Sequence, residues 1–203
     1  AAAAEGPAKP SAGPSAAGHG AGPGRAGLRP LAVRKETYEL LRRARAAREA
    51  ERLGEAVGLY RKAVESNGGY FAPANLELGF ALVGLRRTDE AIEQLSVVVR
   101  RSGSRYPVAS YHLGRLYEHA GRFAEAADAY ARAAELTGET DPHLFADLSR
   151  AREKEGRTAE ALAAMETYVR AAERLGDVPA WARERLANLR QKEAAAQPAA
   201  VKK

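Results

Sequence analysis

The sequence predicts an all-α protein, an α-solenoid of about four helix–turn–helix repeats followed by one C-terminal capping helix. The first observation is a Glu-Ala pair that recurs every 35 residues, with its Ala at positions 56, 91, 126 and 161. The second is a large apolar residue four positions after each of these alanines, and the third is a small residue twelve positions before each of them. Recurrence at such a period is typical of units that cannot bury an apolar face alone and therefore stack.

Each unit is predicted to hold two helices of about 14 residues, packed against each other. The small residues, which let the second helix approach the first, are Ala44, Gly79, Gly114 and Ser149. The large residues, which fill the space between the two helices, are Tyr60, Leu95, Tyr130 and Met165. This pairing predicts a core built between the helices of each unit and between neighbouring units.

The positions of glycine and proline support the same division into units. Glycine just after a helix supplies a left-handed stop, and proline fits the first turn of a helix. The glycines that end units are Gly68, Gly103 and Gly138, and the prolines that open the following units are Pro73, Pro107 and Pro142. Helix pairs are therefore expected to begin near Thr37, Ala72, Pro107 and Pro142, with a ninth helix near Val178.

Composition sets the expected boundaries of the repeat region. Residues 1–36 are rich in Ala, Gly and Pro and are expected to form a flexible tail or linker, because they hold too few large apolar side chains to fold alone. The remaining divisions are four repeats over residues 37–175, a capping helix over 176–196 and a disordered basic C-terminus over 197–203. Trp181, Leu186 and Leu189 give the capping helix one apolar side.

The repeat resembles the tetratricopeptide repeat (TPR). The third unit carries the pattern best, as Leu113-Gly114-x-x-Tyr117 followed by Ala126-x₃-Tyr130, and the second carries Leu78-Gly79-x-x-Leu82 and Ala91-x₃-Leu95. The chain departs from the family at the leading Trp, which is replaced by Leu40, Asn75, Ser110 and Phe145. The resemblance covers about residues 37–175 and implies a scaffold for protein–protein interaction.

The resemblance also implies that the first helices of successive units line a concave groove in which a partner binds. The residue after each small position turns away from the packed face, since each residue advances about 100° around a helix. An arginine row beside aromatic residues results, and we predict a partner-binding groove formed by Arg45, Phe80, Tyr111, Arg115, Arg150, Trp181 and Arg185. Arginine pairs with carboxylates and stacks on rings, so the expected ligand is an acidic or extended protein segment.

No catalytic, cofactor or metal site is predicted, and the chain is not expected to be an enzyme. Cysteine is absent, and no P-loop, zinc-protease or serine-hydrolase motif occurs. The formal G-x-G-x-x-G match at residues 22–27 lies in a Pro/Gly run, without the strand that a dinucleotide site requires. His112 and His119 are seven residues apart on one predicted helix, too far to share a zinc ion, and both are expected at the surface.

The net charge of +6 leaves alternatives open. The main hypothesis is an adaptor that takes part in the assembly of a bacterial envelope or pilus complex. The alternatives are a structural subunit docked through its N-terminal tail, and an RNA- or polyanion-binding solenoid. The arginines that would serve a polyanion are Arg42, Arg43, Arg45, Arg48, Arg52, Arg86, Arg87, Arg100 and Arg101.

The expected location follows from the N-terminal composition. An Ala/Pro/Gly-rich stretch commonly follows a cleaved export signal, and the sequence begins at Ala1 without Met. The protein is therefore expected to be periplasmic or exported. Association with the outer membrane is expected to depend on an N-terminal lipid anchor outside residues 1–203. The alternative is a cytoplasmic protein. The sequence contains no run of about 18 apolar residues, so no transmembrane segment is predicted.

Overall fold

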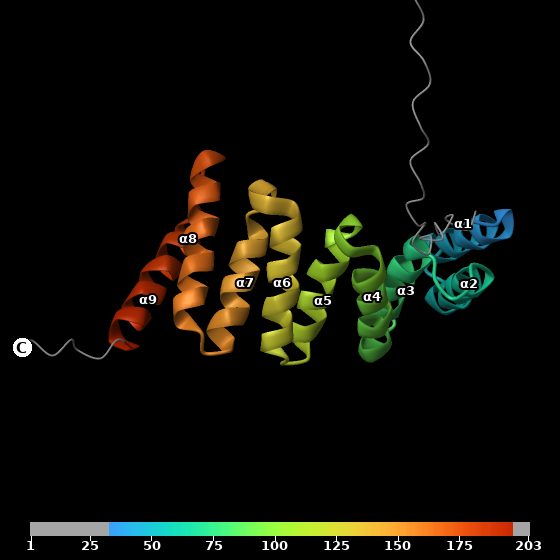
Figure 1. Cartoon of the computed structure of the whole chain (residues 1–203), viewed down its shortest axis with the longest axis horizontal. Helices are drawn as coiled ribbons and strands as arrows, with labels where there is room; N and C mark the ends of the chain where they lie inside the picture. Colours follow the sequence, from blue (N-terminus) through green and yellow to red (C-terminus); the bar gives the residue numbers. More distant parts are fainter. Residues whose placement is uncertain (1–32, 197–203) are drawn as a thin grey trace, which may run out of the picture. The chain divides into compact units, whose positions relative to one another are not determined.

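A computed structural model describes residues 33–196, apart from the side chain of Glu139. These residues form nine α-helices and two short 3₁₀-helices, with no strand among them (Figure 1). The α-helices are α1 Lys35–Glu49, α2 Leu53–Ser66, α3 Ala72–Gly84, α4 Thr88–Ser102, α5 Pro107–His119, α6 Phe123–Thr137, α7 His143–Lys154, α8 Thr158–Arg174 and α9 Ala180–Ala196. The 3₁₀-helices η1 (Gly103–Arg105) and η2 (Gly138–Thr140) follow α4 and α6.

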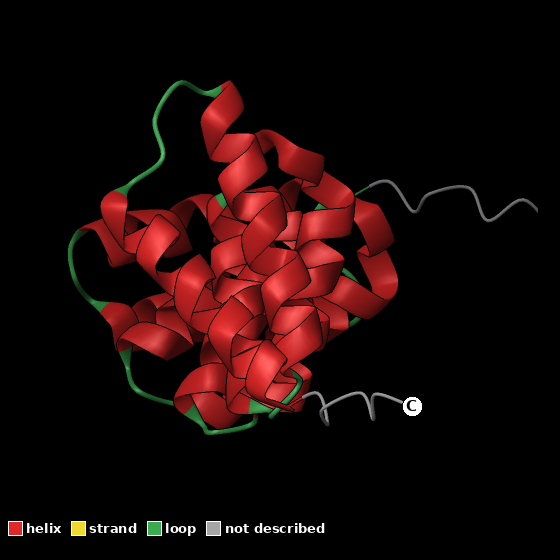
Figure 2. Ribbon diagram, turned by 90° about the vertical axis from the view of Figure 1, so that its left-hand side faces the viewer, coloured by secondary structure: helices red, strands yellow, loops and turns green. Residues whose placement is uncertain are grey.

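The helices of this region pack in sequential pairs. The most extensive contacts join α1 to α2, α3 to α4, α5 to α6 and α7 to α8, and each second helix also packs on the first helix of the next pair. Figure 2 shows that short loops connect the helices. The predicted array of four helix pairs plus one final helix is therefore confirmed, and the final helix α9 packs on α8.

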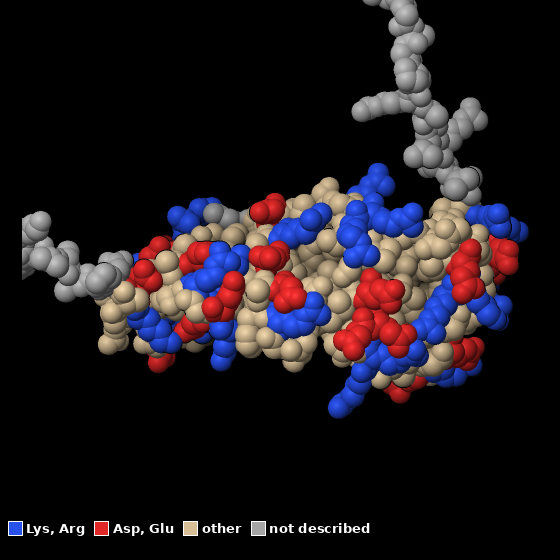
Figure 3. All heavy atoms as spheres, turned by 60° about the horizontal axis from the view of Figure 1, so that its bottom comes forward, with Lys and Arg blue, Asp and Glu red and all other residues tan. Residues whose placement is uncertain are grey.

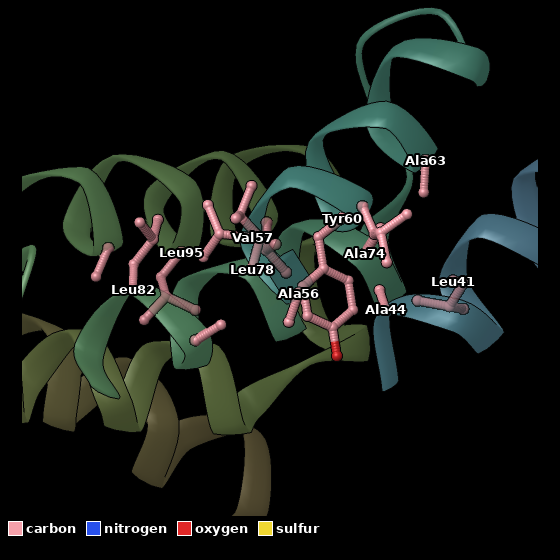
Figure 4. Close-up of a cluster of buried hydrophobic side chains, with 14 of the residues drawn as sticks. Leu41, Ala44, Ala56, Val57, Tyr60, Ala63, Ala74, Leu78, Leu82 and Leu95 are labelled. Atoms are coloured by element: carbon pink, nitrogen blue, oxygen red, sulfur yellow. The ribbon is translucent and has the colours of Figure 1, made fainter. Parts of the chain in front are cut away.

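The predicted interior positions lie in the core. Tyr60, Leu95, Tyr130 and Met165 are all completely buried. The largest cluster extends from α1 to α5, and Figure 4 shows some of its side chains, Tyr60 and Leu95 among them. A β-carbon added at Gly114 would lie 2.6 Å from the Tyr130 ring, and one added at Gly79 would lie 2.8 Å from Leu95. Glycine is needed at both positions because the second helix packs directly on the first.

The turn inside each pair repeats as well. The residue at the tightest point has a positive φ, and in chain order these residues are Glu51, Arg86, Gly121 and Gly156. The next residue is arginine in every pair and forms an ion pair with the glutamate three positions later, as Arg87 does with Glu90 at 2.6 Å. These glutamates belong to the repeated Glu-Ala pairs, so the recurring Glu holds the start of each second helix while the following Ala is buried.

Helix boundaries differ slightly from the sequence prediction. Helix α1 begins at Lys35, inside the expected tail, and Thr37 is fully buried with its hydroxyl 2.8 Å from that of Ser66. Helix α9 begins at Ala180, two residues after the expected Val178. The rest of the predicted tail, residues 1–32, and the predicted C-terminal segment 197–203 lie outside the described residues. None of the described helices is long and apolar enough to cross a membrane.

Candidate partner-binding site

The predicted arginine row lies on the first helix of each pair and on the final helix α9, which we count with the first helices. Its five positions, which we call the row, are Arg45 on α1, Phe80 on α3, Arg115 on α5, Arg150 on α7 and Arg185 on α9. We call each pair of consecutive first helices, with the side chains between them, a joint. The row residues lie at the joints, and their partners differ from one joint to the next.

The α5–α7 joint is held by a charged network. Arg150 donates from Nε and Nη2 to the two carboxylate oxygens of Glu118, at 2.5 and 3.0 Å, and its Nη2 also donates to Asp147 at 2.7 Å. The buried Tyr130 donates its hydroxyl to Glu118 at 2.9 Å. The hydrogen bonds from Arg150 lower the pKa of Glu118, although partial burial opposes this shift. Glu118 is therefore a charged acceptor shared by three helices.

The α1–α3 joint uses the same three residue types with the charges exchanged. Arg45 on α1 donates to Glu77 on α3 at 2.5 and 2.8 Å, and Tyr60 donates its hydroxyl to the same carboxylate at 2.9 Å. The arginine here precedes its glutamate along the array, whereas Arg150 follows Glu118. Burial raises the pKa of Tyr60, and the hydrogen bond to Glu77 raises it further, so the tyrosine remains a neutral donor.

The α7–α9 joint is also bridged. Arg185 donates to Glu153 at 2.7 Å, and Lys192 donates to the other oxygen of Glu153 at 2.6 Å. The hydrogen bond from Lys192 is the main reason that the pKa of Glu153 is lowered. Three of the four arginines in the row are thus engaged by carboxylates of a neighbouring first helix.

The α3–α5 joint is different. The rings of Phe80 and His112 lie 4.5 Å apart, and Val83 is 41% exposed beside them. Among the described residues, Arg115 is exposed and forms no side-chain hydrogen bond or ion pair. Burial lowers the pKa of His112, and the charge of Arg115 lowers it further, so His112 is neutral at pH 7.

Two hollows collect most of the predicted site residues. A pocket of 480 Å³ is lined by Tyr111, His143, Ala146, Asp147, Arg150, Trp181 and Arg185, and we call it the aromatic pocket. A second pocket of 270 Å³ is lined by Phe80, Val83, His112, Arg115, Leu116 and His119, and we call it the α3–α5 pocket. Six of the seven predicted residues therefore line one of two pockets on first helices, while Arg45 lines neither.

Comparison with known families and structures agrees with this repeat geometry. Residues 76–142 match the family described as Tetratricopeptide repeat. Residues 76–142 therefore belong to the tetratricopeptide repeat family, and the described helices share the fold of known TPR proteins. The structure of YrrB, titled a TPR protein with an unusual peptide-binding site, has a TM-score of 0.64 and 20% identity, and the match covers 78% of each chain. No curated protein matches the sequence.

MamA proteins share the TPR fold of this chain. One MamA crystal structure has a TM-score of 0.62 and 22% identity, and the match covers 70% of this chain and 79% of that one. The MamA fragment from Desulfovibrio magneticus RS-1 has a TM-score of 0.61 and 14% identity, and the match covers 82% of this chain and 100% of that one. At these identities the likeness establishes the fold alone, and members of the family that residues 76–142 match are typically scaffolds.

Some features of the site were not predicted from the sequence. His112 was expected at the surface, but it is half-buried against Phe80 and Tyr111. Val83 was not among the predicted site residues, whereas it lines the α3–α5 pocket. The signal was present in the spacing, because the positions 35 and 70 residues after Val83 are Glu118 and Glu153. Among the described residues, no group of three acidic or histidine side chains could hold a metal ion.

Proposed function

We propose that this TPR protein is a scaffold that binds a partner protein on its first helices, with the aromatic pocket as the main contact. The observation that carries the proposal is Trp181, which remains 45% exposed at the edge of a pocket that also contains Tyr111 and two arginines. Exposed aromatic and arginine side chains at a hollow are typical of residues that dominate protein interfaces. YrrB, which shares the fold, is titled as a peptide-binding protein.

The pairing of the basic side chains favours a protein over a polyanion. Many of the arginines proposed to serve a polyanion face carboxylates, as Arg52 faces Glu55 and Arg87 faces Glu90. Figure 3 shows Lys and Arg interspersed with Asp and Glu on the face drawn there. A nucleic-acid groove requires a surface of one sign, and mixed charge does not supply it.

The test begins with site-specific crosslinking in the native cell. A photoreactive amino acid replaces Trp181 in one variant and Leu175, which is 74% exposed at the end of α8, in the control variant. We expect one protein to crosslink from position 181 and not from position 175. The crosslinked protein is then purified and titrated against the wild type and Trp181→Ala.

Trp181→Ala should weaken this binding at least about tenfold, while circular dichroism shows the helical content retained. Arg150 and Arg185 are poor choices for this test, because their replacement also removes bridges between helices. An unchanged affinity for Trp181→Ala would contradict the proposed site. A binding constant that falls steeply with salt, combined with capture of RNA, would favour the polyanion alternative.

We further propose that the scaffold works outside the cytoplasm, in assembly of an envelope or pilus complex. The support is the Ala/Pro/Gly-rich composition of residues 1–36, which is common after export signals. Fractionation of the native cells, followed by detection with an antibody, is the appropriate measurement. Recovery with periplasmic or outer-membrane markers is expected, and recovery with cytoplasmic markers would contradict this placement. Docking of a structural subunit through the tail depends on residues outside the described range and stays a prediction.

A further inference from the structure

Arg115 differs from the other arginines of the row in lacking an internal carboxylate. Arg150 binds Glu118 of the preceding first helix and Asp147 three residues earlier on its own helix. For Arg115, the positions that correspond to these two acids, 35 residues earlier, hold Val83 and His112. Val is apolar and His112 is neutral, so neither position can neutralise the guanidinium.

The acids nearby in sequence register are already engaged. Arg45 binds an acid 32 residues later in the chain, and the residue 32 positions after Arg115 is Asp147. Asp147 instead accepts a hydrogen bond from Arg150 at 2.7 Å. Glu118, one turn after Arg115 on α5, is occupied by Arg150 and Tyr130. Of the four positions that the repeat geometry would offer to Arg115, two hold Val83 and His112, and the acids at the other two are engaged by other side chains.

The place where the acid would lie is hollow. The α3–α5 pocket has a volume of 270 Å³, and Val83 and Phe80 form an apolar wall beside the guanidinium. An apolar wall with one unpaired cation beside it suits a side-chain pair in which a carboxylate adjoins an apolar group. A carboxylate there would form the two-pronged hydrogen bonds that arginine makes with carboxylates elsewhere in the array.

We propose that the α3–α5 pocket binds a glutamate side chain of a partner protein, together with an apolar side chain that adjoins it. The glutamate takes the place at Arg115 that Glu118 has at Arg150. A glutamate side chain is favoured over a C-terminal carboxylate because Glu77, Glu118 and Glu153 are the acids that the same row binds across the other three joints. This inference rests on the proposed function, since it assumes that the partner lies along the first helices.

The key variant supplies the missing acid from within the chain. Val83→Glu places a carboxylate where Glu118 and Glu153 lie in the later units, and it should occupy Arg115 and block the pocket. Val83→Gln is the matched control, because it has nearly the same size without the charge. Arg115→Gln, at an exposed position, removes the cation and provides an independent variant if Val83→Glu does not fold.

The probe is a library of random 12-residue peptides displayed on phage and selected on the wild-type protein. Synthetic versions of the enriched peptides are then titrated by fluorescence anisotropy. We expect the enriched peptides to share a glutamate beside an apolar residue. Changing that glutamate to glutamine, or introducing Arg115→Gln or Val83→Glu, should each weaken binding by about tenfold or more, because hydrogen bonds between charged groups are lost. Val83→Gln removes part of the apolar wall but adds no charge, so it should weaken binding clearly less than Val83→Glu does.

Several outcomes would overturn the inference. These are a library without an enriched peptide, enriched peptides without an acid, binding through the C-terminal carboxylate, and unchanged affinity for Val83→Glu. Peptides that lose affinity with Trp181→Ala but not with Val83→Glu would leave the proposed function standing and remove the inference alone. Peptides insensitive to both variants would count against both proposals. Arg115→Glu paired with a peptide whose glutamate is changed to lysine should restore part of the binding lost by either change alone.

Discussion

The α5–α7 and α3–α5 joints occupy equivalent places in the repeat and are stabilised differently. At α5–α7 the buried Tyr130 and Arg150 both donate to Glu118, so the charges of the row are used inside the protein. At α3–α5 the equivalent filling residue is Leu95, and the contact between first helices is made by Phe80 and His112. One joint is closed by its own ion pair, and the other leaves a cation and an apolar wall exposed.

The difference teaches that a repeat without an internal acid at this joint leaves a cation available at the surface. The fold needs a small residue on the first helix and a large one on the second, and both Gly114 with Tyr130 and Gly79 with Leu95 meet this need. The residues that project between first helices are less constrained by packing. Substitution at one of them therefore changes the surface without changing the array.

The largest expected effect comes from overfilling the two glycine positions. Gly114→Leu forces side-chain atoms against the Tyr130 ring, which is anchored through its hydroxyl on Glu118, whereas Gly79→Leu meets the more flexible Leu95. We expect a loss of free energy of unfolding of about 3 kcal/mol for Gly114→Leu and about 2 kcal/mol for Gly79→Leu. Urea denaturation followed by circular dichroism measures both. A larger loss of unfolding free energy for Gly79→Leu than for Gly114→Leu would mean that the hydrogen bond from Tyr130 to Glu118 does not restrict the movement of the Tyr130 ring.

The next effect concerns Glu118, the acid of the α5–α7 joint. Glu118→Gln removes the charged acceptor of Arg150 and Tyr130 and should lower the free energy of unfolding by about 1–2 kcal/mol. Val83→Gln alters the equivalent position of the α3–α5 joint, which has no such acceptor. This variant should change the free energy of unfolding by less than about 0.5 kcal/mol. Both values come from the same urea titrations. Equal losses in the two variants would remove the energetic distinction between the joints.

The contribution of Glu118 should also depend on pH. Its folded pKa is lowered below the ordinary value of 4.5, chiefly by the hydrogen bonds from Arg150. A carboxylate of this kind stabilises the fold fully above its unfolded pKa, and the stabilisation is lost as pH falls through the folded pKa. The difference in unfolding free energy between the wild type and Glu118→Gln should therefore shrink as pH is lowered from about 7 to about 3. The difference for Val83→Gln should stay constant, and a constant difference for both would contradict the role of Glu118.

The sequence predicted the array well because its core is periodic. The spacing of Tyr60, Leu95, Tyr130 and Met165 identified the fully buried filling positions, and it also assigned the row to first helices. The partners of the row could not be predicted in this way. The pairing of Arg45 with Glu77 and of Arg150 with Glu118 joins residues 32 positions apart on two different helices. It depends on the directions in which these helices project their side chains. The distinct state of Arg115 thus emerges only when all the joints are compared in three dimensions.

The smallest effect concerns His112, which replaces the acidic residues Glu77 and Asp147 found at equivalent positions. His112 packs on Phe80 and Tyr111, with Arg115 as the charged neighbour, and burial and then this charge lower its pKa below 6.5. The unfolded chain therefore binds a proton before the folded chain does as pH falls. The wild type should lose stability relative to His112→Gln between about pH 7 and pH 5, by less than about 1 kcal/mol.

Thermal or urea unfolding of the two proteins across this pH range measures the effect. His119 and His143 are present in both proteins, so their contributions cancel in the difference. A wild type that gained stability on acidification would mean that His112 is stabilised in its charged form, which requires an acid close to it inside the α3–α5 joint. That result would also weaken the argument that Arg115 lacks an internal partner. A bound glutamate side chain, in contrast, should raise the pKa of His112, so the pH dependence of stability should diminish when the selected peptide is present.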